Sequence, residues 1–390
     1  MKEIYLDNAA TTKVDKNVFN EIMIFNEKYY ANPSSQHNIG NKVKKKIEDA
    51  RKKIANFIGA EPEEIIFTSG GTEANNFAIK GLALANPDKK HIITSVIEHP
   101  AVLESCRSLE KQGYQIDYIG VNKEGIVEVK DIEKKIRKDT LVVSIMHVNN
   151  EIGTVQPIAE IGEICKKKKV YFHTDAVQSF KKINIDVNSM NIDLMSVSGH
   201  KINVPKGIGF LYIRLGTRIK PLIDGGGQEF NLRGGTENTV GIIGIAKALK
   251  IDNEEINVRE VRDFMVNELM KIERTKINGS LDNRIWNNIN VSFYGIEGES
   301  LMLMLSEEGI YVSTGSACAS TKLEESYVLK AINVDELYIH GSIRISLDRE
   351  INLESAKIVV EKIKESVEKL RAISPFKIDD NIKEEKKDHE

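Results

Sequence analysis

The sequence predicts an α/β fold in which a mainly parallel sheet lies between helices, joined to a smaller α+β domain. Three observations lead to this prediction. From about residue 40 to 250, short β-rich runs alternate with amphipathic stretches at helical spacing. Beyond about residue 250 this alternation stops. The chain of 390 residues is also long enough to form one large and one small domain.

The elements of the first half are predicted in order from these patterns. The β-rich runs are EIIFTS (64–69), HIITS (91–95), YQIDYIG (114–120), TLVVSIMHV (140–148), VYFHTD (170–175), IDLMSVS (192–198) and GIGFLYI (207–213). Amphipathic stretches separate most of them, at 72–86, 99–112, 128–138 and 158–169. Strands that alternate with helices in this way favour parallel pairing, with helices on both faces of the sheet.

The second half begins with a predicted long helix over roughly 237–272. It continues with NNINVSFYG, a helix at 298–308, IYVST, SIRISL and a last helix, whose apolar stripe is Ala356, Val360, Ile363, Val367 and Leu370. We predict a large domain over 15–255 and a small α+β domain formed by 1–14 and 256–375. The charged residues 376–390 are predicted to be a flexible tail.

The composition narrows the class of protein. A net charge of −3, with 29% charged residues, gives no field that would hold nucleic acid or an anionic membrane. The three cysteines have no paired spacing, which excludes a disulfide framework and a zinc ribbon. The first residues, MKEIYLDNAATT, lack the apolar core of a signal peptide. We therefore expect a cytoplasmic protein with reduced thiols.

Polar residues follow several of the predicted strands, where ligands collect in a parallel sheet. In FTSGGTEANN two glycines precede a helix that begins near Thr72, which fits an anion site or a simple turn. Asp175 ends VYFHTD, with Gln178 three residues later. Its carboxylate fits a helix cap, the commoner case, or a group that keeps a heterocyclic nitrogen protonated.

A second group follows the strand IDLMSVS, in the sequence SGHK. Lys201 follows an apolar strand, so partial desolvation would lower the pKa of its amine and make it a nucleophile. His99 and Asn150 also follow strands, although a single histidine is usually structural. Taken together, these residues predict a pyridoxal phosphate site. Lys201 would bond to the aldehyde, Asp175 would pair with the ring nitrogen and His99 would stack on the ring, while the phosphate would be held by Thr72, Ser198 and His200.

Nine ordered motifs between about residues 4 and 375 then show a resemblance to a known family. They are YLDNAATT, NPSSQH, FTSGGTEANN, EHPAV, HVNNEIGTVQPI, HTDAVQ, SGHK, RGGTEN and GSACAS. In these motifs the chain resembles the cysteine desulfurases, which are pyridoxal-phosphate-dependent enzymes of the class V aminotransferase group with fold type I.

The resemblance implies roles for the matching residues. Lys201, His99 and Cys318 would be catalytic. Asn150 and Arg344 would hold the substrate carboxylate, a task that suits a guanidinium. The cofactor would be bound by Gly71, Thr72, Asp175, Gln178, Ser198, His200, Lys201 and Thr236, the last of these contributed by the second subunit of a homodimer.

The family also implies a reaction and a partner. L-cysteine would become L-alanine, and its sulfur would pass to Cys318 as a persulfide. The small residues around Cys318 suit a mobile loop. The long stretch between Cys318 and Arg344 resembles desulfurases that supply an iron–sulfur cluster scaffold. No resident metal is expected, although Cys318 would be a transient ligand of a cluster during transfer. Cys165 is predicted to be in the core, and Cys106 to be a helix residue without a special role.

Other functions stay open at this point. A selenocysteine lyase or a related class V aminotransferase would use the same scaffold, and so would a non-catalytic partner in a sulfur pathway. The presence of Cys318 argues against a transaminase, and the presence of both Lys201 and Cys318 argues against a non-catalytic protein. The chain departs from the family pattern at Val204, Phe230, Asn231 and Asp348, which leaves the substrate entrance and the subunit contact open.

Overall fold

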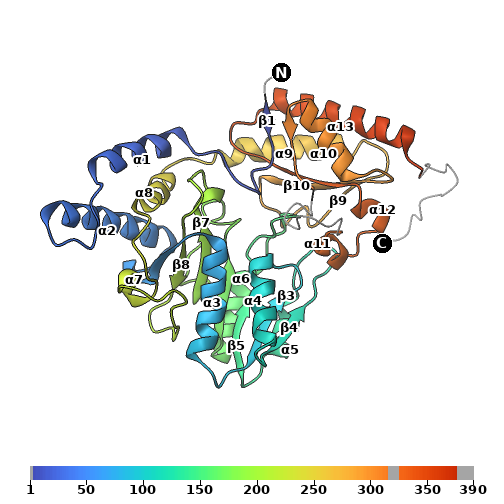
Figure 1. The fold of residues 1–390 in the computed structure, drawn as a ribbon. Helices are drawn as coiled ribbons and strands as arrows, with labels where there is room; N and C mark the ends of the chain where they lie inside the picture. The colour runs from blue at the N-terminus through green and yellow to red at the C-terminus, as the bar shows by residue number, and fades with distance from the viewer. Residues whose placement is uncertain (1–2, 315–324, 376–390) are drawn as a thin grey trace.

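The computed structural model describes residues 3–314 and 325–375, and its larger part is built on a seven-stranded sheet (Figure 1). The strand order is β2-β8-β7-β6-β5-β3-β4, with β8 antiparallel to both of its neighbours and the other pairings parallel. The strands are β2 (Ile65–Thr68), β3 (His91–Ser95), β4 (Gln115–Ile119), β5 (Thr140–Ser144), β6 (Tyr171–Asp175), β7 (Leu194–Ser198) and β8 (Gly209–Ile213). This arrangement confirms the predicted α/β class.

Helices cover both faces of this sheet because successive strand residues point to opposite faces. Ile66 packs with α3 (Gly71–Ala85) and α4 (Pro100–Glu110) on one face. Its neighbours Ile65 and Phe67 pack on the other face. The helices of that second face are α1 (Lys16–Lys28), α2 (Asn38–Ile58), α5 (Val129–Lys135), α6 (Ile158–Lys168) and α8 (Thr239–Ala248).

The smaller part contains a three-stranded antiparallel sheet of order β12-β10-β9. Its strands are β9 (Thr275–Ile277), β10 (Asn288–Phe293) and β12 (Ser342–Ser346), and β1 (Ile4–Tyr5) pairs separately with β11 (Ile310–Tyr311). The helices are α9 (Glu255–Leu269), α10 (Gly298–Glu307), α11 (Tyr327–Ala331), α12 (Glu336–Ile339) and α13 (Leu353–Ile373). A separate apolar cluster fills this part, to which α13 contributes the buried Ala356, Ile363 and Val367.

The prediction of one helix over 237–272 is wrong, because α8 ends at Ala248 and α9 begins at Glu255. Between them Asn253 exchanges two hydrogen bonds with Lys181, one of 2.7 Å from Lys181 Nζ and one of 2.6 Å from Asn253 Nδ2 to the Lys181 carbonyl. Glu254 then takes a left-handed conformation with φ of 52°. These tertiary bonds stop a helix that local periodicity alone would continue.

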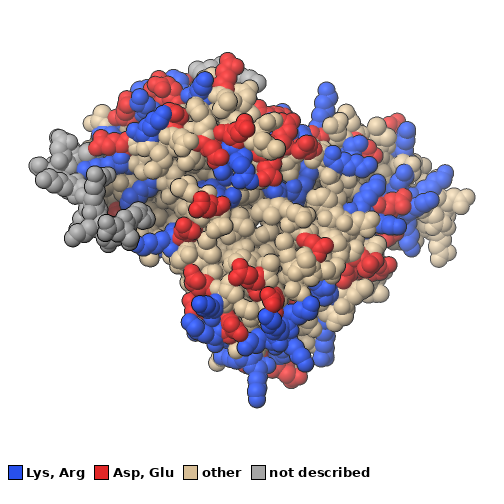
Figure 2. Space-filling view, turned by 180° about the vertical axis from the view of Figure 1, so that it is seen from behind, with Lys and Arg blue, Asp and Glu red and all other residues tan. Residues whose placement is uncertain are grey.

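Figure 2 shows positive and negative side chains mixed over the face seen from behind, so this face has no field of a single sign. Within the described part of the chain, no helix combines the length and apolarity needed to cross a membrane.

The boundary proposed between residues 255 and 256 stays a prediction, as does the tail 376–390, which lies outside the described residues.

Candidate active site

A cavity of about 160 Å³ lies where several strands of the large sheet end. Its wall is formed by side chains that follow β2, β3, β5, β6 and β7, and by Arg344 from β12. The parallel strands bring these sites together because their carboxyl ends share one edge. The predicted site residues in the wall are Gly71, Thr72, His99, Asn150, Asp175, Gln178, Ser198, His200, Lys201 and Arg344.

Lys201 ends the short helix η2 (Gly199–Lys201), which directly follows β7. Its Nζ donates hydrogen bonds to the carbonyl oxygens of Ala9 and Ala10, the second at 2.6 Å. Gln178 Nε2 donates to the same Ala9 oxygen at 2.9 Å. The N-terminal segment therefore holds the lysine amine at the cavity wall, where it is half-buried.

Asp175 is the last residue of β6 and is 4% exposed. Its Oδ2 accepts a hydrogen bond of 2.6 Å from Asn75 Nδ2, and its Oδ1 accepts one of 2.9 Å from the backbone N–H of Val177. Two donors thus fix the plane of a buried carboxylate in the cavity wall. A carboxylate in this setting suits the pairing of a protonated ring nitrogen, because burial strengthens its interaction with a positive group.

His99 caps α4, and this contact fixes its tautomer. Its Nδ1 accepts a hydrogen bond of 3.1 Å from the backbone N–H of Ala101, so the neutral ring carries its proton on Nε2. Burial lowers the pKa of His99; nearby Asp175 raises it, and Lys201 lowers it further. The structure therefore favours a neutral ring whose Nε2–H is the donor.

The other end of the cavity suits an anion. α3 begins at Gly71, after Gly70 with φ of 152°, and has no side-chain cap. The first N–H groups of a helix lack partners within the helix, so this end can bind an anion. Ser198 lies beside this turn, and a Cβ at Gly71 would come within 2.7 Å of Val177 Cγ2. The His200 Nδ1 lies 3.1 Å from Thr11 Oγ1.

Burial, Lys201 and Lys206 together lower the pKa of His200 to about 4. His200 is therefore neutral at pH 7 in the structure described. A bound phosphate would oppose this shift, because an adjacent anion favours the charged form of the imidazole.

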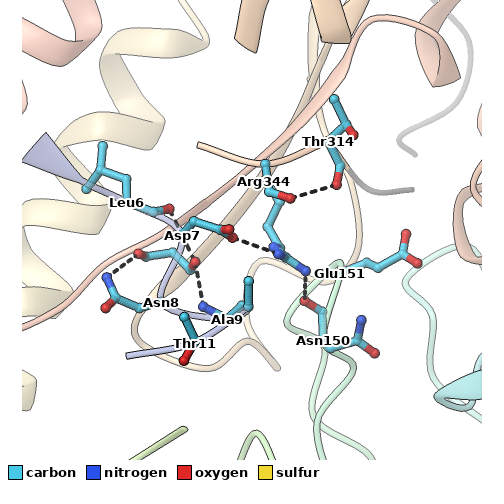
Figure 3. Close-up of polar contacts among 12 residues, drawn as sticks. Leu6, Asp7, Asn8, Ala9, Thr11, Asn150, Glu151, Thr314 and Arg344 are labelled. Atoms are coloured by element: carbon cyan, nitrogen blue, oxygen red, sulfur yellow. Dashed lines mark hydrogen bonds and ion pairs between the residues drawn. The ribbon is translucent and has the colours of Figure 1, made fainter. Parts of the chain in front are cut away.

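Arg344 lies at the wall contributed by β12 and is 2% exposed. Its Nη2 donates to Asp7 Oδ1 at 2.8 Å and its Nη1 to the Asn150 carbonyl at 3.1 Å, so the guanidinium lies between these residues (Figure 3). Within the described residues, Arg344 Nε and Asn150 Oδ1 are both buried without a hydrogen-bond partner. Arg344 thus offers a cation with a buried N–H donor next to the cavity, as a carboxylate ligand requires. Asn150 could bind a carboxylate only through the N–H groups of its amide, because its Oδ1 is an acceptor.

Comparison with known proteins identifies the family. The model of the class-V aminotransferases matches residues 4–358. The chain is 51% identical over 383 residues to the cysteine desulfurase IscS of Dictyoglomus turgidum (strain DSM 6724 / Z-1310), covering 96% of this chain and 97% of that protein.

The chain belongs to the cysteine desulfurases of the class-V aminotransferase family.

Further similarities agree with this membership. Cysteine desulfurase IscS of Methanosarcina thermophila is 51% identical over 381 residues, covering 96% of this chain and 94% of that protein. The solved structure of a NifS-like protein has a TM-score of 0.89 at 39% identity, covering 95% of this chain and all of the other. A structure of SspA in complex with cysteine has a TM-score of 0.81 at 40% identity, covering 89% and 99% of the two chains. The predicted resemblance is confirmed.

Two predicted residues of this cysteine desulfurase are not part of the cavity described. Thr236 is exposed and does not line it, and Cys318 lies outside the described residues. The other two thiols are buried, as predicted for Cys165. Burial raises the pKa of Cys106 to about 12, and it also raises the pKa of Cys165 above its ordinary value. Neither thiol has the thiolate character that nucleophilic sulfur chemistry needs.

The four departures from the family pattern lie away from the cavity wall. Val204 is 1% exposed and packs in the core near α8, whereas Asp348 is half-buried. Phe230 and Asn231 are exposed. The Phe230 ring lies 5.0 Å from the Arg51 guanidinium, which pairs with the buried Glu229.

Sequence reasoning missed the residues that orient the site residues. Asn75 holds Asp175, Asp7 pairs with Arg344, and the Ala9 carbonyl receives both Lys201 and Gln178. Asn75 and Asp7 lie within motifs used for the family resemblance, FTSGGTEANN and YLDNAATT. Their roles depend on contacts between distant segments, which a motif does not specify.

Proposed function

We propose that this cysteine desulfurase converts L-cysteine to L-alanine, with pyridoxal 5′-phosphate as cofactor, and transfers the sulfur to Cys318 as a persulfide. The observation that supports this most strongly is the single cavity that combines the Lys201 amine, the buried Asp175 carboxylate and the Arg344 guanidinium. An amine nucleophile, a partner for a ring nitrogen and a carboxylate clamp are the groups that this chemistry requires.

The residues present fit pyridoxal phosphate in charge and hydrogen-bonding type. Asp175 would pair with the ring nitrogen, Gln178 with the phenolic oxygen and His99 with the ring face. The phosphate would be held by Gly71, Thr72, Ser198 and His200, at the start of α3. When bound, the cofactor supplies an aldehyde and an electron-withdrawing ring that stabilises negative charge at the substrate α-carbon.

The chain's own groups then bind and orient the substrate. Arg344 would hold the α-carboxylate through its buried Nε, which has no partner among the described residues, and Asn150 through the N–H groups of its amide, since both residues line the cavity. Lys201 would hold and move the α-proton through Nζ, which two carbonyl oxygens keep at the wall. His99 would donate a hydrogen bond from Nε2, the atom that bears its proton in the tautomer described.

Sulfur transfer would use the Cys318 thiolate. The thiolate would attack the sulfur of the bound cysteine, forming an S–S bond as the substrate C–S bond breaks. The electron pair of the broken bond would stay with the substrate carbon, which gains a proton and becomes the methyl group of alanine. The overall change, cysteine plus thiol to alanine plus persulfide, is balanced without an external oxidant or reductant.

The persulfide sulfur would then pass to an acceptor protein, which we propose is an iron–sulfur cluster scaffold. The IscS names of the relatives support this choice. Cys318 would serve as a transient cluster ligand, and the transfer would take place in the reducing cytoplasm.

One experiment tests the central claim. The protein is purified with its cofactor and incubated with L-cysteine, alanine is quantified, and persulfide is mapped by mass spectrometry. We expect one alanine for each sulfur transferred, with the added sulfur on Cys318. Alanine formation with persulfide only on Cys106 or Cys165 would refute the assigned thiol. Absence of both products would refute the activity.

We also propose a homodimer in which each subunit lends Thr236 to its partner's phosphate site. Thr236 is exposed in the single chain, which fits this role. Mixed dimers of Lys201→Ala and Thr236→Ala subunits would then contain one intact site, and their activity should exceed that of either parent variant. No recovery in dimers shown to have exchanged subunits would contradict the shared site.

A further inference from the structure

Beside the carboxylate pocket formed by Arg344 and Asn150, an aspartate from the opposite end of the chain contacts the guanidinium. Asp7 Oδ1 accepts a hydrogen bond of 2.8 Å from Arg344 Nη2 across 337 positions in sequence. The Asp7 side chain is 22% exposed, whereas that of Arg344 is 2% exposed. Figure 3 shows the two side chains directed toward one another, with Asn150 on a second side of the guanidinium.

The backbone around Asp7 is held firmly along β12. Asn8 Nδ2 donates to the Ser346 carbonyl at 2.9 Å, the Ala9 N–H donates to Ser346 Oγ at 2.8 Å, and the Ser346 N–H donates to the Leu6 carbonyl at 2.7 Å. These contacts hold the segment around Asp7 against Ser346, which lies two residues after Arg344 on β12. The position of Asp7 is thus fixed independently of its ion pair.

The ion pair and the Asn150 carbonyl use both terminal nitrogens of Arg344. Nη2 is bonded to Asp7 and Nη1 to Asn150, while the buried Nε has no partner among the described residues. A guanidinium held at both ends keeps a single orientation. Its buried Nε–H, together with the second N–H of each terminal nitrogen, then remains to donate to a ligand. The carboxyl of Glu151 also lies in the electrostatic range of Arg344, but its hydrogen bond is made with Ser326 Oγ.

We propose that Asp7 is a positioning residue that orients Arg344 for recognition of the substrate α-carboxylate. This inference rests on the proposed function, and it adds to it a residue that determines specificity for amino acids over simple amines. Asp7 acts through Arg344 and does not touch the reacting atoms. It keeps the buried guanidinium paired when the pocket is empty, which avoids an uncompensated buried charge.

The charge of Asp7 has a second effect of opposite sign. As an anion it repels an incoming carboxylate, so removal of the charge alone would tighten carboxylate binding. Positioning and repulsion therefore predict changes in opposite directions. Asp7→Asn weighs the two effects against each other, because asparagine keeps an acceptor oxygen of the same size but loses the charge and weakens the hold on Arg344. A fall in the preference means that positioning outweighs repulsion.

The test compares L-alanine with ethylamine, which differ by the carboxylate alone. Binding of each to the cofactor-loaded dimer is measured by the change in visible absorption, in the parent protein, Asp7→Ala and Asp7→Asn. We expect the preference for alanine over ethylamine to fall at least about tenfold in Asp7→Ala, as for loss of a charge-assisted hydrogen bond, and by a smaller factor in Asp7→Asn. Cofactor absorption and ethylamine binding should stay at the parent level.

The matched control is Asp263→Asn. Asp263 also pairs with a largely buried arginine, Arg262, but on α9 away from the cavity. This variant should keep the parent preference. An unchanged or increased preference in Asp7→Asn, or equal weakening of both ligands in either Asp7 variant, would overturn the proposal. If Asp7→Ala does not fold, the result for Asp7→Asn tests the proposed role of Asp7 by itself.

Results for the parent protein keep this inference distinct from the proposed function. A parent that binds alanine but releases no sulfur from cysteine would refute the function and leave the role of Asp7 testable. A parent with normal sulfur transfer, together with an unchanged alanine preference in the Asp7 variants, would refute the role of Asp7 alone.

Discussion

The two sides of the cavity are assembled in different ways. On the large-sheet side, Asp175, Ser198 and Lys201 follow the neighbouring strands β6 and β7, and fewer than thirty residues of sequence contain them all. On the other side, Arg344 comes from β12 and is paired with Asp7, 337 positions away. The first side follows from the register of one sheet, whereas the second exists only once the chain ends meet. Substitutions in the smaller part of the molecule should therefore disturb the residues on the sheet side less than they disturb Arg344.

The largest expected effect is on the sheet side. Lys201→Ala should lower alanine formation by about three orders of magnitude or more, because among the described residues no other lysine lines the cavity. It should also change the visible absorption of the bound cofactor. Lys167→Ala, at an exposed position on α6, is the matched control. Alanine production near the parent rate in Lys201→Ala would remove the basis for the cofactor assignment.

The next effect separates sulfur transfer from substrate binding. Cys318→Ser should leave the cofactor absorption and alanine binding unchanged but reduce sulfide release by about three orders of magnitude, because serine cannot form a persulfide. Cys106→Ser should instead keep activity and lower the free energy of unfolding by about 1–3 kcal/mol, through burial of an unpaired hydroxyl. The reverse pattern, with activity dependent on Cys106, would show that the wrong thiol has been assigned.

A smaller effect concerns the orientation of Asp175. Asn75→Ala removes the 2.6 Å hydrogen bond to Asp175 Oδ2, at a cost of about 1.5–3 kcal/mol for a bond to a charged group. We expect kcat to fall about tenfold or more with little change in the preference for alanine over ethylamine. Asp7→Ala should show the converse. If kcat and the preference for alanine over ethylamine fall equally in Asn75→Ala and in Asp7→Ala, the two sides of the cavity do not have separate roles.

The last expected effect concerns the pH dependence of stability. The histidines with a lowered pKa, among the described residues, are His91, His99, His147, His173 and His200, and all of them lie in the large part. Burial lowers the pKa of His147 to about 4, so the folded state binds fewer protons than the unfolded chain below pH 6.5. Stability from this group is fully present above pH 6.5 and is lost as the pH falls toward 4.

Hydrogen exchange at pH 7 and pH 5 measures this difference. Each buried histidine should cost up to about 1.4 kcal/mol per pH unit in this window. We expect strands β5, β6 and β7 to lose protection at pH 5 before β10 and β12. His147→Phe should reduce the difference between the two pH values. Earlier loss of protection in the small part would contradict the assignment of acid sensitivity to these histidines.

The sequence by itself determined the fold class, the family and most of the sheet-edge residues. The periodicity of apolar residues in strands and helices can be recognised within a short stretch of sequence. Residues at the carboxyl ends of parallel strands must share one edge of the sheet, as Asp175, Ser198 and Lys201 do. The break between α8 and α9 was not predicted, because the bonds of Asn253 to Lys181 are tertiary contacts. Periodicity alone describes a continuous helix there.

Only the tertiary structure decided which groups orient the site. The carbonyls that receive Lys201 and the pairing of Asp7 with Arg344 require segments distant in sequence to meet. A motif records which side chains are present, but the direction of a hydrogen bond depends on where folding places its partner. The position of the partner is most important for buried groups such as Arg344, because water cannot replace a hydrogen-bond partner that is missing there.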